Sequence, residues 1–429
     1  MFGFFASQDK KARQNAANWL ELADKVWHFR RDVLPARDAG ELRGRTEALQ
    51  QLVKAKADAG RLKLGIDALE DVLRRTGGAM YPKTSLVENV EFFLVAAIVI
   101  LGIRTYFVQP FKIPTNSMWP TYNGMTSEVY PQRADEPSVP AAAARLVAFG
   151  ATPHRLDAPA DGEILIPVGG ASRRGLIYSR PVPGRTWLVI PTTVREYTLL
   201  VGDEPVSVKV PMDFDFDWTI YDAFFAGREG YQPARLLAAL ESRLQAGQFV
   251  DTIVNGERVH CIRTGKYVKQ GERVLSFDEI TGDQLFVDRF SYHFTRPAVG
   301  SGFVFRTGNI PDLAREDGDQ YFIKRLVGTP GDTLAVDGHR ILRNGKPIAG
   351  SSAFEANARQ SGRYPGYVAY GLLAPGRQVQ VPADGYFAMG DNSPNSKDSR
   401  YWGFVPAKDV IGRPLMVYFP FSRHWGPAR

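Results

Sequence analysis

The segment VEFFLVAAIVILGIRTYFV, from Val90 to Val108, divides the chain into two parts of different character. It is apolar apart from Glu91 and Arg104 near its ends, and about 19 residues at a rise of ~1.5 Å reach ~28 Å, close to the ~30 Å hydrocarbon core of a bilayer. The alternative is a buried core helix, because the uninterrupted apolar run is only about 12 residues long. We favour a transmembrane helix, which we place at residues 85–109, with its long terminal side chains snorkelling to the interface.

The part that precedes this segment has helical periodicity. Apolar residues recur at steps of three and four within 15–34, 42–53 and 62–73, which predicts two or three amphipathic helices separated near Pro35 and Gly60. Such helices can bind a partner or a membrane surface, but the simpler interpretation is a small helical hairpin that packs on itself. The first five residues lack the charged and apolar regions of a cleavable signal peptide.

The part that follows the segment is typical of antiparallel β structure. Short β-branched and aromatic runs alternate with Gly, Pro and Asp turns. Only Pro233–Ala246 has a clear helical pattern, and the Pro- and Ala-rich stretch at 136–144 is the best candidate for a linker. The runs that predict strands most clearly are Thr186–Pro191, Glu196–Val201, Pro205–Val210, Gly302–Arg306 and Arg340–Arg343.

The composition excludes several classes of protein. With 429 residues, 44% of them apolar and 23% charged, the chain is globular rather than mainly disordered. A mean hydropathy of −0.22 excludes a multi-span transporter. The single cysteine, Cys261, excludes an intrachain disulfide and a thiolate metal cluster. A net charge of +7 suits either nucleic acid or an anionic membrane and does not distinguish them.

The distribution of basic residues predicts the orientation of the membrane helix. Sixteen Lys and Arg residues precede position 84, whereas after Lys112 the next basic residue is Arg133. The positive-inside rule therefore places residues 1–84 in the cytoplasm, as an amphipathic helical region, and everything after about residue 109 on the other side.

Conventional catalytic and metal-binding motifs are missing from the sequence. The six histidines form no HExxH or other compact metal-ligand pattern, and no Gly-rich phosphate loop follows a strand. A Ser-His-Asp triad stays possible, since its members need not be neighbours in sequence, but no G-x-S-x-G elbow supports it. We therefore interpret each histidine as structural or surface, and expect no metal and no cofactor.

Three other segments are more informative. They are Gln109–Thr121 (QPFKIPTNSMWPT), Tyr321–Asp332 (YFIKRLVGTPGD) and Met389–Pro406 (MGDNSPNSKDSRYWGFVP). In this order they closely resemble the bacterial type I signal peptidases, membrane-anchored serine proteases that use a lysine as general base. The third segment is the most specific, whereas the Ser-Met-x-Pro of the first would be weak alone.

The resemblance also predicts how the chain is divided. Gly282–Tyr292 looks like the segment that in the family follows the nucleophile within a few residues, but here it comes about 160 residues later. We therefore expect a mainly β catalytic domain, with signal-peptidase-like antiparallel sheets, at 110–123 and 281–429. A large β-rich inserted accessory domain is expected at 124–280. The N-terminal helical segment and one transmembrane helix complete the expected fold.

The residue types in these segments suit acyl transfer. A serine hydroxyl is a poor nucleophile until a base takes its proton, and a lysine can be that base only if burial lowers its pKa from ~10.4 toward neutrality. Lys324 lies in an apolar run that could have this effect. By resemblance, Ser117 is the nucleophile, Lys324 the general base, and Ser396 the hydroxyl that orients the lysine ammonium group.

The resemblance implies roles for further residues. The backbone N–H of Ser117 and the hydroxyl of Thr115, where the family usually has serine, are the expected oxyanion donors. Asp398 and Arg400 are expected to form a supporting ion pair, and Gly390 a tight turn. The small residues of a substrate would lie against a wall formed by Phe111, Ile113, Pro114, Tyr122 and Ile323.

The expected function is removal of signal peptides from exported preproteins on the outer, periplasmic face of the bacterial cytoplasmic (inner) membrane. The expected partners are signal peptides and the lipid bilayer, not nucleic acid, and the oligomeric state stays open. The self-cleaving Ser-Lys repressors share the dyad, but they are cytosolic and DNA-linked, and the membrane segment argues against them. A non-enzymatic membrane-anchored scaffold is disfavoured by the joint presence of Ser117, Lys324 and Ser396.

Overall fold

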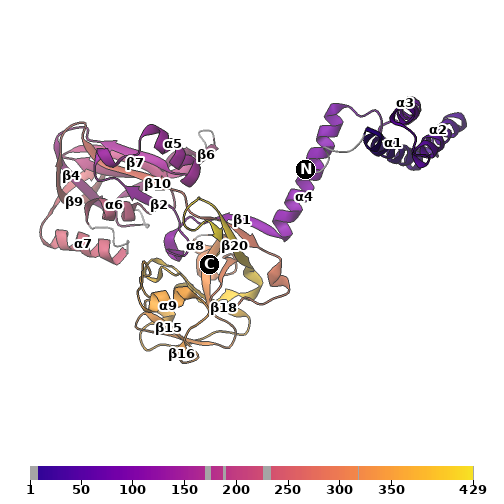
Figure 1. Ribbon diagram of the computed structural model, residues 1–429. Helices are drawn as coiled ribbons and strands as arrows, with labels where there is room; N and C mark the ends of the chain where they lie inside the picture. Colours follow the sequence, from indigo (N-terminus) through magenta and orange to yellow (C-terminus); the bar gives the residue numbers. More distant parts are fainter. Residues whose placement is uncertain (1–7, 170–174, 187–189, 226–232, 317, 429) are drawn as a thin grey trace. The chain divides into compact units, whose positions relative to one another are not determined.

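The structure is a computed structural model that describes residues 8–169, 175–186, 190–225, 233–316 and 318–428. It contains two compact units, residues 1–101 and 102–429. The first is helical and the second mainly β (Figure 1). Helix α4 (Ser85–Tyr106) begins in the first unit and ends in the second.

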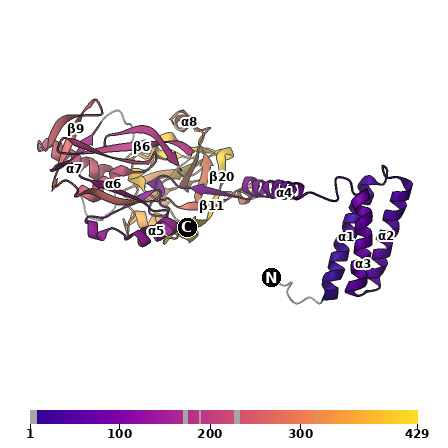
Figure 2. The same cartoon turned by 90° about the horizontal axis from the view of Figure 1, so that it is seen from above.

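Three helices lie side by side in the first unit: α1 (Gln8–Arg30), α2 (Ala36–Lys54) and α3 (Ala59–Thr76) (Figure 2). Their apolar faces meet in a common core that includes Leu49, Leu62 and Leu69. This confirms the prediction that these helices pack on one another, although they form a bundle of three helices and not a two-helix hairpin. The second break falls at residues 55–58, because Asp58 caps α3 by accepting a hydrogen bond from the Arg61 N–H at 3.0 Å. Gly60 therefore lies in the first turn of α3.

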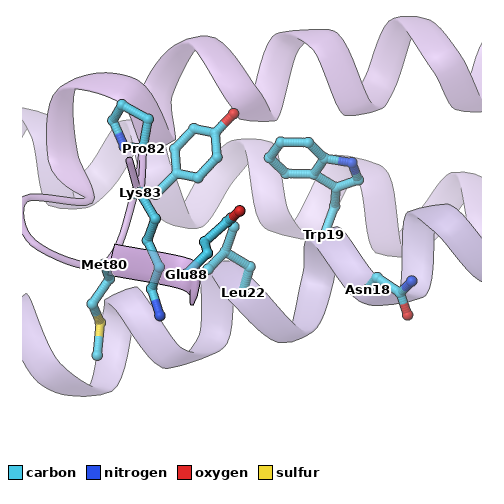
Figure 3. Close-up of a pocket in the computed structure, with 8 residues that line it drawn as sticks. Asn18, Trp19, Leu22, Met80, Pro82, Lys83 and Glu88 are labelled. Carbon is cyan, nitrogen blue, oxygen red and sulfur yellow. The ribbon is translucent and has the colours of Figure 1, made fainter. Parts of the chain in front are cut away.

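A hollow of about 440 Å³ lies between α1 and the segment that leads into α4 (Figure 3). The Trp19 ring packs edge-on against Tyr81, with ring centroids 5.4 Å apart. The Tyr81 hydroxyl donates a hydrogen bond to Glu70 of α3 at 2.6 Å. These contacts attach the segment that follows α3 to the helical bundle.

Helix α4 is long and apolar enough to cross a membrane, and it is the only such helix in the described part of the chain. None of its residues is buried, and Phe92, Phe93 and Ile98 are each more than half exposed. The arrangement does not match the alternative of a buried core helix.

The second unit contains an eight-stranded antiparallel sheet in the order β1-β11-β20-β12-β13-β18-β19, with β21 paired to β20. The residues between β13 and β18 form a four-stranded sheet in the order β16-β15-β14-β17. The helices α8, α9 and α10 are short. Strands β12 and β15 coincide with expected strands. The bounds are β1 (Val108–Lys112), β11 (Gln284–Asp288), β12 (Gly302–Arg306), α8 (Pro311–Glu316), β13 (Tyr321–Gly328), β14 (Thr333–Asp337), β15 (Arg340–Arg343), β16 (Lys346–Pro347), α9 (Ser352–Ala358), β17 (Val379–Gln380), β18 (Gly385–Met389), α10 (Ser399–Trp402), β19 (Val405–Pro406), β20 (Val410–Phe419) and β21 (Gly426–Pro427).

The pairing of β1 with β11 joins two segments that are far apart in sequence. Val108 lies opposite Asp288, and Lys112 opposite Gln284. Immediately before β11, the Asp283 N–H donates a hydrogen bond to the Asn123 carbonyl oxygen at 2.8 Å. The chain therefore leaves the neighbourhood of this sheet after Asn123 and returns to it at Asp283.

Residues between these two points form two further antiparallel sheets around their own apolar core, which includes Ile164, Leu199, Phe216 and Phe277. One sheet has the order β2-β10-β3 and the other β5-β6-β4-β9-β8, with β7 paired to β6. Expected strands 196–201 and 205–210 lie in β6 and β7, whereas the run 186–191 includes residues 187–189, which lie outside the described residues. The bounds are β2 (Thr126–Val129), β3 (Thr152–Asp157), β4 (Gly162–Val168), β5 (Ser179–Thr186), β6 (Ile190–Val201), β7 (Glu204–Pro211), β8 (Phe249–Val254), β9 (Glu257–Val268) and β10 (Arg273–Ile280).

Three helices accompany these two sheets: α5 (Val139–Phe149), α6 (Phe216–Phe224) and α7 (Pro233–Gln245). Helix α7 confirms the helix that the sequence predicts at Pro233–Ala246. The expected linker at 136–144 is wrong, because α5 begins there: its proline lies in the first turn, where a missing N–H costs little, and alanine is a strong helix former. Helix α6 was not predicted, because its first residues alternate aromatic and acidic side chains in a strand-like period.

Candidate active site

Ser117 lies in a single 3₁₀ turn, η1 (Asn116–Met118), that closely follows β1. Asn116 fixes this turn through its side chain. Its Nδ2 donates a hydrogen bond to the Met125 carbonyl oxygen at 2.9 Å, and its Oδ1 accepts one from the Gly124 N–H at 3.0 Å. Ser117 itself is half-buried, so its hydroxyl is held in place without being sealed from solvent.

Lys324 of β13 reaches Ser117 from the eight-stranded sheet. Its residue surface is 4% exposed, and its Nζ donates a hydrogen bond to Ser117 Oγ at 2.5 Å. Desolvation on burial lowers the pKa of Lys324 to about 8, because a buried ammonium group loses its hydration, and the nearby Asp398 carboxylate opposes this effect. Lys324 can therefore lose its proton near neutral pH, which an ordinary lysine cannot.

The loop after β18 approaches the Ser117 turn closely. The Asn392 N–H donates to the Ser117 carbonyl oxygen at 3.0 Å, and Asn392 Nδ2 donates to the Asn116 carbonyl oxygen at 3.0 Å. A Cβ atom at Gly390 would lie 2.6 Å from Ser396 Cβ, and closer still to Ser396 Oγ and to the Ser117 carbonyl oxygen. Gly390 has no positive φ, so the close approach of two loops, and not a left-handed turn, requires glycine here.

Asp398 and Arg400 form a buried ion pair that holds this loop. Arg400 Nε donates to Asp398 Oδ1 at 2.8 Å, and the Gly390 N–H donates to Asp398 Oδ2 at 3.0 Å. Arg400 Nη2 also donates to the carbonyl oxygen of Ser393 at 2.7 Å. Both side chains thus act on the backbone of the loop that contains Gly390 and Ser396.

Two other expected site residues, Ser396 and Thr115, take no part in the hydrogen bonds described above. Ser396 Oγ is buried and has no hydrogen-bond partner among the described residues, so the structure contains no hydrogen bond from it to Lys324. Thr115 is exposed, and its side chain does not cap η1. The structure therefore leaves both hydroxyl groups able to bond to another group.

Four of the five expected wall residues share one apolar cluster: Phe111, Ile113, Tyr122 and Ile323. Ile113 and Tyr122 are only 3% and 1% exposed, so they form the interior of this cluster. Phe111 and Ile323 are half-buried and supply its accessible surface. Pro114 is exposed and lies outside the cluster.

Sequence reasoning gave no role to Arg325 and Asp391, although both lie in the quoted segments. They form a buried bidentate pair, with Nε–Oδ1 and Nη2–Oδ2 distances of 2.7 and 2.6 Å. The Thr121 hydroxyl donates to Asp391 Oδ2 at 2.5 Å. The pair thus ties together β13, the loop after β18 and the segment that follows Ser117, and no local pattern reveals that these residues meet.

Removing one member of this pair is expected to destabilise the second unit strongly. Asp391→Ala leaves a buried guanidinium without its counter-charge, which typically costs about 3–5 kcal/mol. The exposed pair of Glu355 and Arg359 is the control, since Glu355→Ala should cost under about 1 kcal/mol. Denaturant unfolding of both variants in detergent measures the difference, and equal small losses would contradict the prediction.

The one histidine that is buried in the described part of the chain is structural. His424 Nδ1 and Asp283 Oδ2 are 2.7 Å apart, and the same carboxylate oxygen accepts a hydrogen bond from the Asn123 N–H at 2.7 Å. His424 therefore supports the point at which the chain returns to the eight-stranded sheet. Within the described ranges, no three His, Cys, Asp or Glu side chains are placed to hold a metal ion.

Comparisons with known proteins give a consistent family. The family model "Signal peptidase, peptidase S26" matches residues 276–419, a range that includes Lys324 and Gly390 but begins after Ser117. The chain is 38% identical over 145 residues to probable signal peptidase I-1 of Synechocystis sp., covering 34% of this chain and 66% of that protein. It is 31% identical over 158 residues to signal peptidase I P of Bacillus subtilis subsp. natto, covering 37% and 78%.

One more relative and one solved structure complete the comparison. Signal peptidase I of Leptolyngbya laminosa is 37% identical over 141 residues, which are 33% of this chain and 62% of that protein. The chain thus spans slightly less than two thirds of the length of the Synechocystis and Leptolyngbya relatives. A crystal structure of a signal peptidase I from Enterococcus faecalis V583 matches with a TM-score of 0.21 and 26% identity, covering 28% of this chain and 97% of that one.

Proposed function

The chain belongs to the signal peptidase family, peptidase S26, and we propose that it is a membrane-bound serine endopeptidase that cleaves signal peptides from exported preproteins. Ser117 is the nucleophile and Lys324 the general base. The observation that carries the proposal is the 2.5 Å hydrogen bond between a buried lysine Nζ and a serine Oγ. An unprotonated lysine at this position can take the serine proton directly.

The reaction follows from this geometry. Neutral Lys324 accepts the Ser117 proton as Oγ attacks the scissile carbonyl carbon, and the ammonium group then donates the proton to the leaving amine. The N–H of Ser117 and the hydroxyl of Thr115 are the proposed donors to the oxyanion, each worth roughly 3 kcal/mol. Lys324, neutral again, takes a proton from the water that attacks the acyl-enzyme and returns it to Ser117 Oγ as the ester bond breaks.

The remaining site residues support this chemistry. The buried Ser396 hydroxyl has no hydrogen-bond partner among the described residues. It orients the lysine amine during turnover. Ser396→Ala should therefore lower kcat more than it raises KM. The apolar surface of Phe111 and Ile323 receives the small residues of an Ala-x-Ala-like substrate, and Pro114 borders it.

The direct test is cleavage of a preprotein by the purified full chain in detergent. Wild type should release a mature protein of the size that removal of the signal peptide predicts, and Ser117→Ala should not. Ser352→Ala, at an exposed serine of α9, is the matched control and should keep wild-type turnover. A folded wild type that leaves several preproteins intact would overturn the proposal.

The proposed location is the bacterial cytoplasmic membrane, with α4 as a single span. Residues 1–84 lie in the cytoplasm and residues 110–429 on the periplasmic side, because basic residues concentrate before the span. Protease added to intact spheroplasts is expected to digest the C-terminal part and spare the N-terminal helices. Protection of the C-terminal part until the membrane is opened would contradict this topology.

We also propose that residues 124–280 are an accessory domain inserted into a catalytic domain made of residues 110–123 and 281–429. The separate apolar core and the pairing of β1 with β11 support this division. Its position after the Ser117 turn suggests that it guides or limits substrate access. A variant that lacks residues 130–278, stays folded and cleaves several preproteins at unchanged rates would exclude that role.

A further inference from the structure

The residue that follows the Ser117 turn packs against helix α6. Trp119 is 5% exposed, and its ring lies edge-on to Trp218 with ring centroids 5.3 Å apart. The other members of this apolar cluster come from α6, α7 and β9: Tyr221, Leu236, Leu240 and Ile262. The described members of the apolar cluster around Trp119 thus come from residues 168–262, and none belongs to the eight-stranded sheet.

The loop that carries Ser396 lies near the first residue of α6. Asp215 caps this helix by accepting a hydrogen bond from the Trp218 N–H at 3.4 Å. The Asn395 side chain lies close enough to this carboxyl group to lower its pKa, against the larger opposite effect of burial. Asn395 ends the short 3₁₀ turn η5 (Ser393–Asn395) and directly precedes Ser396, and α7 contacts the same turn. Helices α6 and α7, which contact each other, therefore together contact the loops that carry Ser117 and Ser396.

Helix α6 is itself firmly held on its other face. Phe216 and Ile220, one helical turn apart, are fully buried in the core of the sheets at 124–280. The Thr219 hydroxyl donates a hydrogen bond to Ser127 Oγ on β2 at 2.9 Å. Trp218 and Tyr221 belong instead to the cluster with Trp119. The helix thus has one face in its own core and another against Trp119, the residue that follows the Ser117 turn.

We propose that α6 positions the Ser117 and Lys324 dyad, with Trp218 and Asp215 bridging the Ser117 turn and the Ser396 loop. Both are positioning residues, since neither touches the reacting atoms. The inference rests on the proposed function and gives residues 124–280 a part in turnover itself, beyond access of the substrate. A displacement of about 1 Å between catalytic groups can cost ~100-fold in rate, so the loss of either contact should be visible in kcat.

The test compares Trp218→Ala with two matched variants in the full chain. Trp218→Ala should lower kcat by about 10–100-fold and change KM by less than about threefold. Trp218→Phe, which keeps an aromatic ring against Trp119, should recover most of the loss. Leu200→Ala is the control, because Leu200 is buried in a different cluster of the same sheets; it should lose stability but keep kcat per folded molecule.

The pH profile separates positioning from simple destabilisation. In Trp218→Ala, water entering beside Lys324 should move the rising limb of kcat above pH 8, toward the value of a solvated lysine. In Leu200→Ala the limb should stay in place. Asp215→Ala should lower kcat by about tenfold and Asp215→Asn by much less, because asparagine can still cap α6 by accepting from the Trp218 N–H.

Hydrogen exchange gives a readout that does not depend on proteolysis. Amide exchange at Trp119 and Asn392, whose N–H groups bond within these two loops, should accelerate in Trp218→Ala and not in Leu200→Ala. Equal exchange and equal kcat losses in the two variants would overturn the inference. Failure of wild type to cleave any preprotein, together with loop-specific exchange in Trp218→Ala, would instead overturn the proposed function and leave the positioning role supported.

Discussion

Lys324→Arg is expected to lower turnover of a signal-peptide substrate by roughly 10⁴-fold or more, the loss typical of removing one member of a nucleophile–base pair. Guanidinium stays protonated above pH 12 and cannot accept the Ser117 proton, so keeping the charge does not rescue the reaction. Lys324→His should retain a trace of activity at most. Lys346→Arg, at an exposed lysine of β16, is the control and should match wild type.

The pH dependence of kcat in the wild-type chain follows from the pKa of Lys324. Burial lowers the pKa of Lys324 to about 8, and only the neutral amine is a base, so kcat should rise with pH up to about 8 and then level off. Replacing any single histidine should leave this profile unchanged. The measurement is turnover from pH 6 to 10 for each variant. Substantial activity in Lys324→Arg, or loss of activity in a folded histidine variant, would exclude the dyad.

Burial of Lys324, the proposed general base, should also lower the free energy of unfolding. A pKa lower in the folded than in the unfolded chain means that the fold disfavours the ammonium form, so the penalty is complete below about pH 8 and disappears as pH rises from 8 toward 10.5. Lys324→Met should therefore be inactive yet more stable at pH 7, by a margin on the order of 3 kcal/mol less the lost hydrogen bond. Denaturant unfolding at pH 7 and pH 10.5 should show the margin shrinking.

Gly390→Ala is expected to lower kcat by about 100-fold or more while the chain still folds, because the added methyl group must push the Ser396 loop away from the Ser117 turn. The clash involves the Ser117 carbonyl oxygen as well as Ser396, and a backbone atom cannot rotate away. Gly302→Ala is the matched control, since a methyl group there would make only ordinary contacts of 3.5 Å or more.

A second variant identifies which contact matters. If Ser396 alone obstructed the methyl group, Gly390→Ala combined with Ser396→Gly would match Ser396→Gly alone. We expect the combination to be much worse, because the clash with the Ser117 backbone persists. Near-wild-type kcat in Gly390→Ala would contradict the close approach of the two loops.

The sequence by itself determined the local elements and singled out the proposed reacting groups. The periodic apolar residues of α1 to α3 and the long apolar run of α4 need only neighbours in the chain to specify helices. Strands β12 and β15 follow from short β-branched and aromatic runs between turns. Lys324 was identifiable because its motif and its apolar flanks are contiguous in sequence.

The tertiary structure alone decided how distant segments meet. The β1–β11 register brings Asn123 beside Asp283 across the whole of 124–280, and no local pattern encodes a contact over that separation. The same holds for the pairing of Arg325 with Asp391 and the packing of Trp119 on Trp218. Gly390 was visible in its motif, but only folding shows that the neighbouring loop excludes a methyl group. These contacts depend on the packing of whole sheets, so their free energy belongs to the fold and not to any one segment.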